Sequence, residues 1–106
     1  MTKIKNILYS ILVAVFSLSL MSFTVVIDAG HGGDDFGAIG LVKGIKEKDL
    51  NLTVAKQLAT KISQKFPEVK VVLTRDTDIF LLFLKRADIA NKNHADLFIS
   101  IHTNAA

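Results

Sequence analysis

The apolar positions of this chain fall into short continuous runs and longer periodic stretches, and each kind predicts a different element. Residues 25–27 form an unbroken β-branched run, Val-Val-Ile, which favours a strand over residues 23–28 that is covered on both faces. Two further apolar runs, at residues 69–74 and 96–101, have the length and composition of strands. The pattern therefore predicts three short buried strands.

Helical spacing appears between these strands. Residues 47–66 carry apolar side chains at every fourth position, with Ala55 and Ala59 beside them, and Pro67 follows. The repeated positions are Leu50, Val54, Leu58, Ile62 and Phe66. A second helix is predicted within residues 79–93, although its apolar opening is also compatible with a few strand residues. In that second helix we expect Asp78 to be the cap, and we expect one face to carry Leu81, Leu84, Ala87 and either Ala90 or Asn91.

Three strands separated by two helices predict an α/β fold with a mostly parallel sheet flanked by helices, in the order β-α-β-α-β. Crossovers between parallel strands are right-handed, so all three strands should end at one edge of the sheet. Open sheets of this kind place ligand sites at that edge. Polar residues that directly follow the strands are therefore the first candidates for function.

The N-terminus has the character of an export signal. Lys3 and Lys5 precede a charge-free, apolar stretch that contains no clear A-x-A cleavage site. We expect residues 1–22 to be a signal peptide or an uncleaved signal anchor, and residues 23–106 to be one domain. A folded N-terminal helix is the less favoured alternative, and membrane contact is expected only through this segment.

Charge and cysteine content exclude several classes of protein. The net charge of +3 falls to about neutral without the leader, because Lys3 and Lys5 lie within it, so we expect no nucleic-acid partner. The chain has no cysteine, which excludes disulfides, thiolate metal ligands and a lipidated cysteine.

A histidine set among glycines follows the first strand. Gly30, Gly32 and Gly33 surround His31 and would let the backbone turn sharply there, while His102 directly follows the third strand. Glu47 opens the first long helix and should begin near the same edge. Two imidazoles and one carboxylate are a usual ligand set for a catalytic zinc ion that keeps one position open, and such sites serve amide or ester hydrolysis.

Each of these polar residues also has an ordinary structural interpretation. A glutamate in the first turn of a helix commonly complements the helix dipole at the surface, and a histidine in a glycine loop is often a solvated turn residue. We expect His94 to be solvated, Asp28 to orient His31 or cap the glycine loop, and Arg75 and Arg86 to form surface ion pairs.

Six blocks of sequence, in order, resemble the zinc-dependent N-acetylmuramoyl-L-alanine amidases of bacterial cell-wall metabolism, often called amidase type 3. The blocks are VVIDAGHGG at 25–33, GAIG at 37–40, KEKDLNL at 46–52, VLTRDTD at 72–78, RADIAN at 86–91 and ADLFISIH at 95–102. Ala29 stands where the family commonly has proline. The resemblance covers residues 23–106 and places the family's ligands for one Zn²⁺ ion on His31, Glu47 and His102.

The resemblance implies a hydrolase exported to the periplasm, cell envelope or exterior. Its substrate would be bacterial peptidoglycan, cleaved at the amide between N-acetylmuramic acid and the L-alanine of the stem peptide. In the family a catalytic glutamate lies near the end of the domain, beyond the position of Ala106, and no residue of this chain matches it. We therefore expect the 106-residue chain to be the N-terminal part of a catalytic domain, truncated at its C-terminus, that can hold zinc but is not a competent amidase alone.

Two other classes stay open at this point. A non-catalytic peptidoglycan-binding module is the first alternative. A phosphate-cradling α/β protein that uses the glycine loop is a more distant one, and it would require helix N-terminal amides that face the loop.

Overall fold

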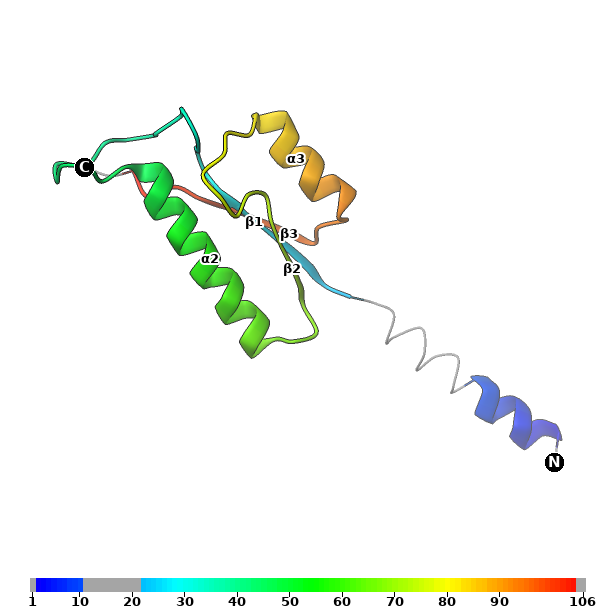
Figure 1. Cartoon of the computed structure of the whole chain (residues 1–106). Helices are drawn as coiled ribbons and strands as arrows, with labels where there is room; N and C mark the ends of the chain where they lie inside the picture. Colours follow the sequence, from blue (N-terminus) through cyan, green and yellow to red (C-terminus); the bar gives the residue numbers. More distant parts are fainter. Residues whose placement is uncertain (1, 11–21, 105–106) are drawn as a thin grey trace.

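A computed structural model describes residues 2–10 and 22–104 of the chain. It contains strand β1 (Thr24–Ala29), helix α2 (Glu47–Lys65), strand β2 (Lys70–Leu73), helix α3 (Phe83–Lys92) and strand β3 (Leu97–Ile101) (Figure 1). The strands form one parallel sheet in the order β2-β1-β3. The predicted α/β fold is confirmed, and each strand begins and ends within one residue of its predicted bounds.

Strand β1 is the centre of the sheet and is buried along its whole length. Val25, Ile27 and Ala29 form the core together with Ala55 of α2. Residues of a strand alternate between faces, so Asp28 points to the opposite face, where it meets Arg86 of α3. The charge-free run at 25–27 therefore corresponds to a strand covered on both sides, as predicted.

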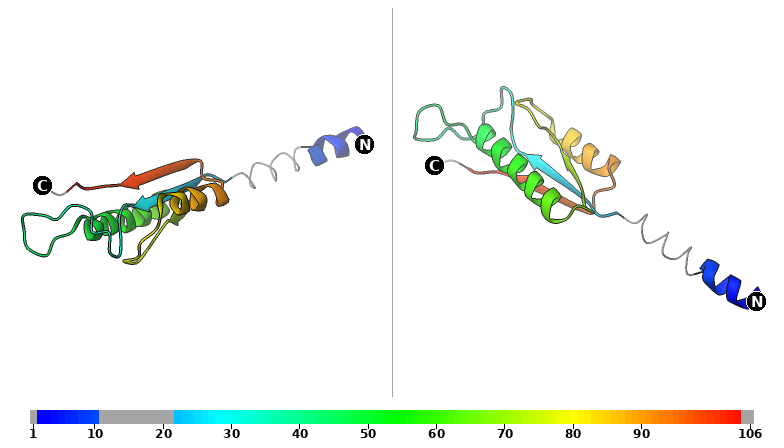
Figure 2. Two further views of the ribbon diagram at one scale, coloured as in Figure 1. Left: turned by 90° about the horizontal axis from the view of Figure 1, so that it is seen from above. Right: turned by 60° about the horizontal axis from the view of Figure 1, so that its bottom comes forward.

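The two helices cover opposite faces of the sheet (Figures 1 and 2). Strands β2 and β3 lie on opposite sides of β1, so the two right-handed crossovers run in opposite directions and place their helices on different faces. Both views of Figure 2 show the loop between β1 and α2 reaching past the end of the sheet where β3 finishes. That loop carries the glycine segment to the strands' carboxyl edge.

Helix α2 occurs as predicted, but its buried face is not the one that the four-residue repeat indicates. Leu50 and Val54 are 38% and 40% exposed, whereas Asn51 and Ala55 are fully buried. A four-residue step advances slightly more than one helical turn, so the repeat drifts around the helix axis and only its later members, such as Leu58, pack against the core.

Helix α3 is shorter than predicted, because residues 79–82 precede it and Leu82 is its extended N-cap residue. Asp78 does not cap this helix; its carboxylate accepts hydrogen bonds from the Gly33 amide and the Lys48 ammonium. Leu84 is 84% exposed, and the buried positions of α3 are Arg86 and Ala90. Apolar residues in this segment thus face outward while an arginine faces the sheet.

Most of the predicted leader lies outside the described residues. Residues 2–10 are helical and exposed, and residues 11–21 are not described. No helix within the described residues combines the length and the apolar character needed to cross a bilayer. The predicted role of residues 1–22 stays a prediction.

Candidate metal centre

His31, Glu47 and His102 meet at the carboxyl edge of the sheet. The His31 Nε2 and Glu47 Oε2 atoms are 3.2 Å apart, and the His102 Nδ1 atom is 3.3 Å from the same oxygen. The two imidazole rings meet edge to face with their centroids 4.9 Å apart. One nitrogen or oxygen of each residue lies within 4.8 Å of those of the other two. The topology therefore brings together the three residues that the sequence singled out.

Glu47 is buried rather than at the surface, where a first-turn glutamate is commonly found. It is the first residue of α2 and only 2% exposed. Burial raises the pKa of its carboxyl group, but hydrogen bonds from the Ala38 amide and the Asn51 side chain, together with the nearby His31, outweigh burial and lower this pKa to about 2. The carboxylate is therefore ionised at neutral pH and can act as a metal ligand.

Asp35 orients His31. The sequence suggested Asp28 for this role, or for capping the glycine loop. The His31 Nδ1 atom lies 2.9 Å from Asp35 Oδ2, and the hydrogen bond with His31 keeps the pKa of Asp35 below its ordinary value. An ionised carboxylate can only accept, so His31 donates its Nδ1–H to Asp35, and Nε2 is the ring nitrogen that faces Glu47. A carboxylate behind a histidine is the usual arrangement around a metal-binding imidazole.

Two glycines provide space for the imidazole rings. A Cβ atom added at Gly30 would collide with the ring of His102. At Gly37 it would lie 2.6 Å from the His31 ring and 2.8 Å from a carboxylate oxygen of Glu47. His31 itself has a φ of 64°, a left-handed conformation that a non-glycine residue adopts only at some cost. The loop is therefore shaped around its side chains.

Two buried arginines hold the main chain of this loop, so the expectation that they form surface ion pairs was wrong. Arg75 and Arg86 are 2% and 5% exposed. Both donate to the carbonyl of Ala29; Arg75 also donates to that of Gly30, and Arg86 to that of His31. Three consecutive carbonyl groups are thus fixed, which holds His31 in its unusual conformation.

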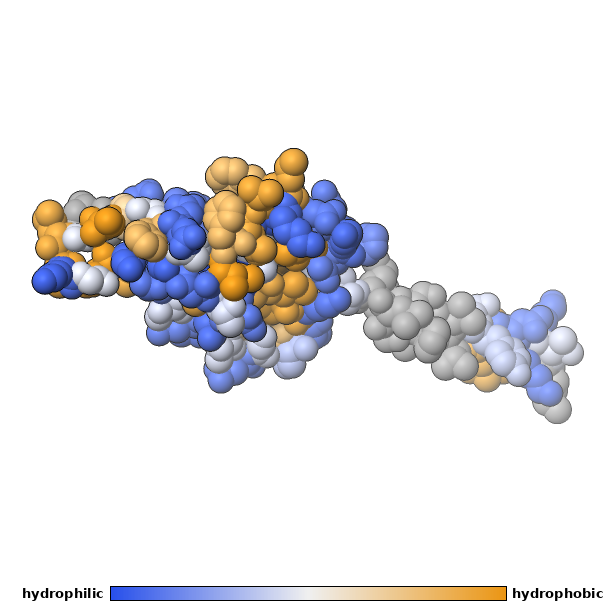
Figure 3. Space-filling view, turned by 45° about the horizontal axis from the view of Figure 1, so that its top comes forward, coloured by the Kyte–Doolittle hydropathy of each residue, from blue (hydrophilic) through white to orange (hydrophobic). Residues whose placement is uncertain are grey.

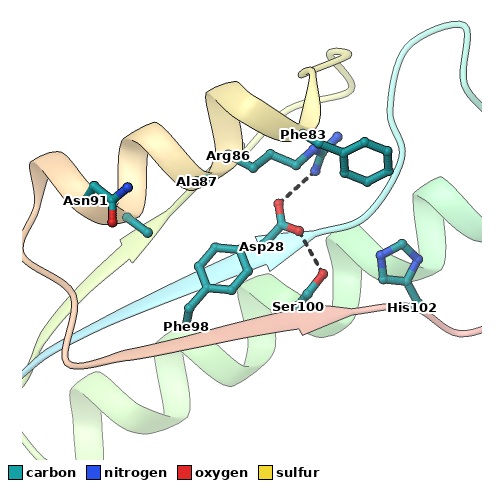
Figure 4. A pocket seen from close by; sticks show the side chains of 9 residues that line it. Asp28, Phe83, Arg86, Ala87, Asn91, Phe98, Ser100 and His102 are labelled. Atoms are coloured by element: carbon teal, nitrogen blue, oxygen red, sulfur yellow. Dashed lines mark hydrogen bonds and ion pairs between the residues drawn. The ribbon is translucent and has the colours of Figure 1, made fainter.

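Asp28 links the central strand to both neighbouring strands and to α3. Its carboxylate accepts hydrogen bonds from Ser100 and Arg86, each at 2.8 Å (Figure 4), and from Thr74 at 2.7 Å. Burial raises the pKa of Asp28, yet these hydrogen bonds, led by Arg86, hold it below its ordinary value. The residue therefore belongs to the frame of the site.

Two cavities adjoin the histidines. One, of 370 Å³, lies between α3 and β3 and is lined by Phe83, Phe98 and His102 among others (Figure 4). The other, of 220 Å³, is bordered by His31, His102 and residues 80–83. Figure 3 shows apolar side chains close together on one face of the part formed by residues 22–104. Several side chains of the segment 79–84 are exposed. There is consequently room beside the histidines for part of a ligand.

Two of the three donor separations fit a tetrahedral metal ion. With zinc bonds of about 2.0–2.1 Å, the edge of a tetrahedron of ligand atoms is about 3.3 Å. The separations of Glu47 Oε2 from the His31 and His102 nitrogens are 3.2 and 3.3 Å. Both histidine contacts are therefore compatible with a shared zinc ion.

Sequence reasoning missed several residues that support the site. Asp35, Lys48 and Asn51 were not singled out, and His94, exposed at the end of α3, takes no part in the cluster. Asn51 could have been found, because it lies four residues after Glu47 and hence on the same face of the helix. Asp35 lies in an irregular loop, where spacing does not predict contact.

Comparisons with known proteins find several relatives of this chain. The family described as N-acetylmuramoyl-L-alanine amidase, type 3, matches residues 25–106. The endolysin of Bacillus phage SPP1 is 48% identical over 85 residues, which are 80% of this chain and 30% of that protein. The probable N-acetylmuramoyl-L-alanine amidase AmiB of Haemophilus influenzae is 39% identical over 103 residues, which are 95% of this chain and 24% of that protein.

A solved structure shares the fold. The N-acetylmuramoyl-L-alanine amidase from Clostridium difficile 630 superposes with a TM-score of 0.75 at 45% identity, covering 80% of this chain and 45% of that one. The chain thus spans less than half the length of each of these proteins.

Proposed function

This chain belongs to the N-acetylmuramoyl-L-alanine amidase family, and we propose that it forms the metal-binding part of a zinc-dependent amidase that cleaves bacterial peptidoglycan. The bond hydrolysed is the amide between N-acetylmuramic acid and the L-alanine of the stem peptide. The observation that carries this proposal is the convergence of His31, Glu47 and His102, with their donor atoms within 4.8 Å of one another.

We assign one Zn²⁺ ion to His31, Glu47 and His102, and no residue of the chain as general base. Three protein ligands leave the fourth position of a tetrahedral ion open. A zinc ion held by these three residues would lower the pKa of a coordinated water and polarise a carbonyl oxygen, which is the chemistry that amide hydrolysis requires.

The protein's own residues prepare this site. Asp35 fixes the tautomer and orientation of His31. The Ala38 amide and Asn51 keep Glu47 ionised. The cavity bordered by His31, His102 and residues 80–83 gives the scissile carbonyl a partly apolar place to lie beside the ion.

Export follows from the same substrate, since peptidoglycan lies outside the cytoplasmic membrane. We propose that residues 1–22 direct export, as a cleaved signal or an anchor, and that residues 23–106 belong to the catalytic domain.

Zinc stoichiometry is the first test. The purified chain should bind one Zn²⁺ per molecule, and His31→Ala and Glu47→Ala should each lose it. His94→Ala, which removes an exposed histidine, should retain zinc.

A chimera tests catalysis. Residues 25–106 replace the homologous segment of the SPP1 endolysin, and release of L-alanine-linked peptides from purified peptidoglycan is measured. The chimera should cleave the wall, stop when a chelator is added, and be inactive with Glu47→Ala. Wall binding that persists after chelation, from a chimera that releases no peptide, would instead favour the non-catalytic binding module.

A further inference from the structure

Asn51 contacts all three segments that carry the proposed zinc ligands. Its side chain is fully buried one helical turn after Glu47. The amide nitrogen donates to the Glu47 carboxylate at 3.2 Å and to the carbonyl of Gly30, the residue before His31, at 3.1 Å. The amide oxygen accepts from the Thr103 backbone N–H, directly after His102, at 2.9 Å.

The orientation of this amide follows from its partners. Its nitrogen faces two acceptors and its oxygen faces one donor, so a flipped amide would set oxygen against oxygen and nitrogen against N–H. An aspartate of the same shape has no donor for Gly30 and would place a second carboxylate beside Glu47. Only an amide of this length supplies all three hydrogen bonds from this position of the helix.

Of the three proposed ligands, His102 depends most on Asn51 for its position. Regular pairing of β3 with β1 reaches Ile101, whose carbonyl accepts the Gly30 amide. His102 is 38% exposed at its side chain, and the ring lies over Gly30, where a Cβ atom would collide with it. Asn51 hydrogen-bonds to both segments that meet where the His102 ring packs on Gly30: to the Gly30 carbonyl and to the Thr103 N–H.

We propose that Asn51 is the positioning residue of the metal site, which sets the distance between the His31 and His102 segments and aims Glu47 between them. This inference rests on the zinc site proposed above. Asn51 does not touch the ion; it fixes the spacing of the three ligands before the ion binds. Outer residues that orient metal ligands commonly change metal affinity by about 10- to 100-fold.

The test uses the full chain with Asn51→Asp and Thr103→Pro. The first keeps the shape of the side chain and removes its donors. The second removes the N–H that Asn51 accepts, but it also fixes φ at residue 103 and restricts the backbone of His102, so its decisive outcome is unchanged zinc binding. Zinc affinity is measured by chelator competition, and Co²⁺ is used as a second probe because its visible absorption reports coordination geometry. Asn93→Asp is the matched control, since Asn93 donates one hydrogen bond, to the Ile89 carbonyl in α3, outside the metal cluster.

Both variants should bind Zn²⁺ at least 10-fold more weakly than the unsubstituted chain and should change the intensity of the Co²⁺ bands, whereas Asn93→Asp should bind zinc within about twofold of it. A purely structural role would lower thermal stability and leave the Co²⁺ spectrum of the loaded protein unchanged, which would overturn the proposal.

If Asn51→Asp does not fold by circular dichroism, Thr103→Pro decides: unchanged zinc affinity and Co²⁺ spectrum in that variant overturn the proposal. Failure of the unsubstituted chain to bind zinc would overturn the zinc site as well. Normal zinc binding by the unsubstituted chain together with normal binding by Thr103→Pro would overturn the role of Asn51 alone.

Discussion

At the scale of single residues, the site requires a glycine without a Cβ atom at position 30 as well as its donor atoms. The His102 ring occupies the space where any residue other than glycine at position 30 would carry its Cβ atom. Gly30 is buried, and the Arg75 guanidinium and the Asn51 amide hold its carbonyl. The main chain there cannot move away to admit a methyl group without breaking these contacts.

Gly30→Ala should therefore displace His102 and lower zinc affinity by at least 10-fold, with a loss of stability of about 1–3 kcal/mol from overpacking. Gly40→Ala is the matched control, because its added Cβ would lie 3.5 Å from the nearest atoms of Ile45, an ordinary contact. Chelator competition measures the first effect and urea unfolding the second. Equal zinc affinity in both variants would contradict this account of Gly30.

The meeting of His31, Glu47 and His102 could be anticipated from sequence because it depends on topology. A histidine after each of two parallel strands, and a glutamate at the start of the intervening helix, must approach one edge. The contacts of Asp35, Arg75 and Arg86 could not be anticipated, since they depend on the path of irregular loops and on long side chains. An arginine within a polar stretch gives no sign that it is buried.

At the scale of elements, α3 is fastened to β1 through a buried ion pair. Arg86 Nη1 lies 2.8 Å from Asp28 Oδ1, and both side chains are at most 6% exposed. Removal of one partner of a buried pair leaves a charge without compensation, which costs far more than loss of a surface pair. Asp28 also accepts hydrogen bonds from Thr74, directly after β2, and from Ser100 of β3, so this one carboxylate connects α3 and β1 to the other two strand segments.

Asp28→Asn should lower the free energy of unfolding by about 3 kcal/mol at pH 7. The folded-state pKa of Asp28 lies below its unfolded value. The stability from this carboxylate is thus complete above about pH 4 and is lost as pH falls through the folded pKa. Urea unfolding at several pH values should show a flatter acid dependence for Asp28→Asn than for the unsubstituted chain.

Asp88→Asn is the comparison for that experiment. Asp88 pairs with Lys92 on the exposed side of α3, where solvent screens the interaction. The variant should keep nearly the same stability at pH 7. An acid dependence as flat as that of Asp28→Asn would show that exposed carboxylates, and not the buried pair, govern acid unfolding.

At the scale of the whole molecule, large apolar side chains are exposed around the start of α3. Leu82, Phe83 and Leu84 are 66%, 86% and 84% exposed, and Leu97 and Phe98 of the edge strand β3 are about half exposed. Adjacent exposed apolar side chains favour association in water. The periodicity of residues 79–93 does not reveal this exposure, because it fits a buried helix face equally well.

Residues 23–106 alone should therefore self-associate at micromolar concentrations. The double variant Phe83→Lys, Leu84→Lys should weaken this association by about tenfold or more in sedimentation velocity, since it removes two contacts and adds repulsion. Leu41→Lys, in the loop before α2, is the control; Leu41 is 93% exposed and stands apart from α3 in sequence. Equal effects of the two substitutions would point to nonspecific charge repulsion.

The central place of β1 also sets an order of assembly. Contacts between β1 and β2 join residues about 46 positions apart, as in the bond from Thr74 to Asp28, whereas contacts between β1 and β3 join residues 72 apart, as in the bond from Ser100. A longer chain closure costs slightly more entropy, which favours the pairing of β1 with β2 before the pairing of β1 with β3. His102 thus arrives with β3, the last of these three strands to pair, and the proposed metal site forms only after β3 has joined β1. During refolding, tight zinc uptake should therefore follow the pairing of β3 with β1.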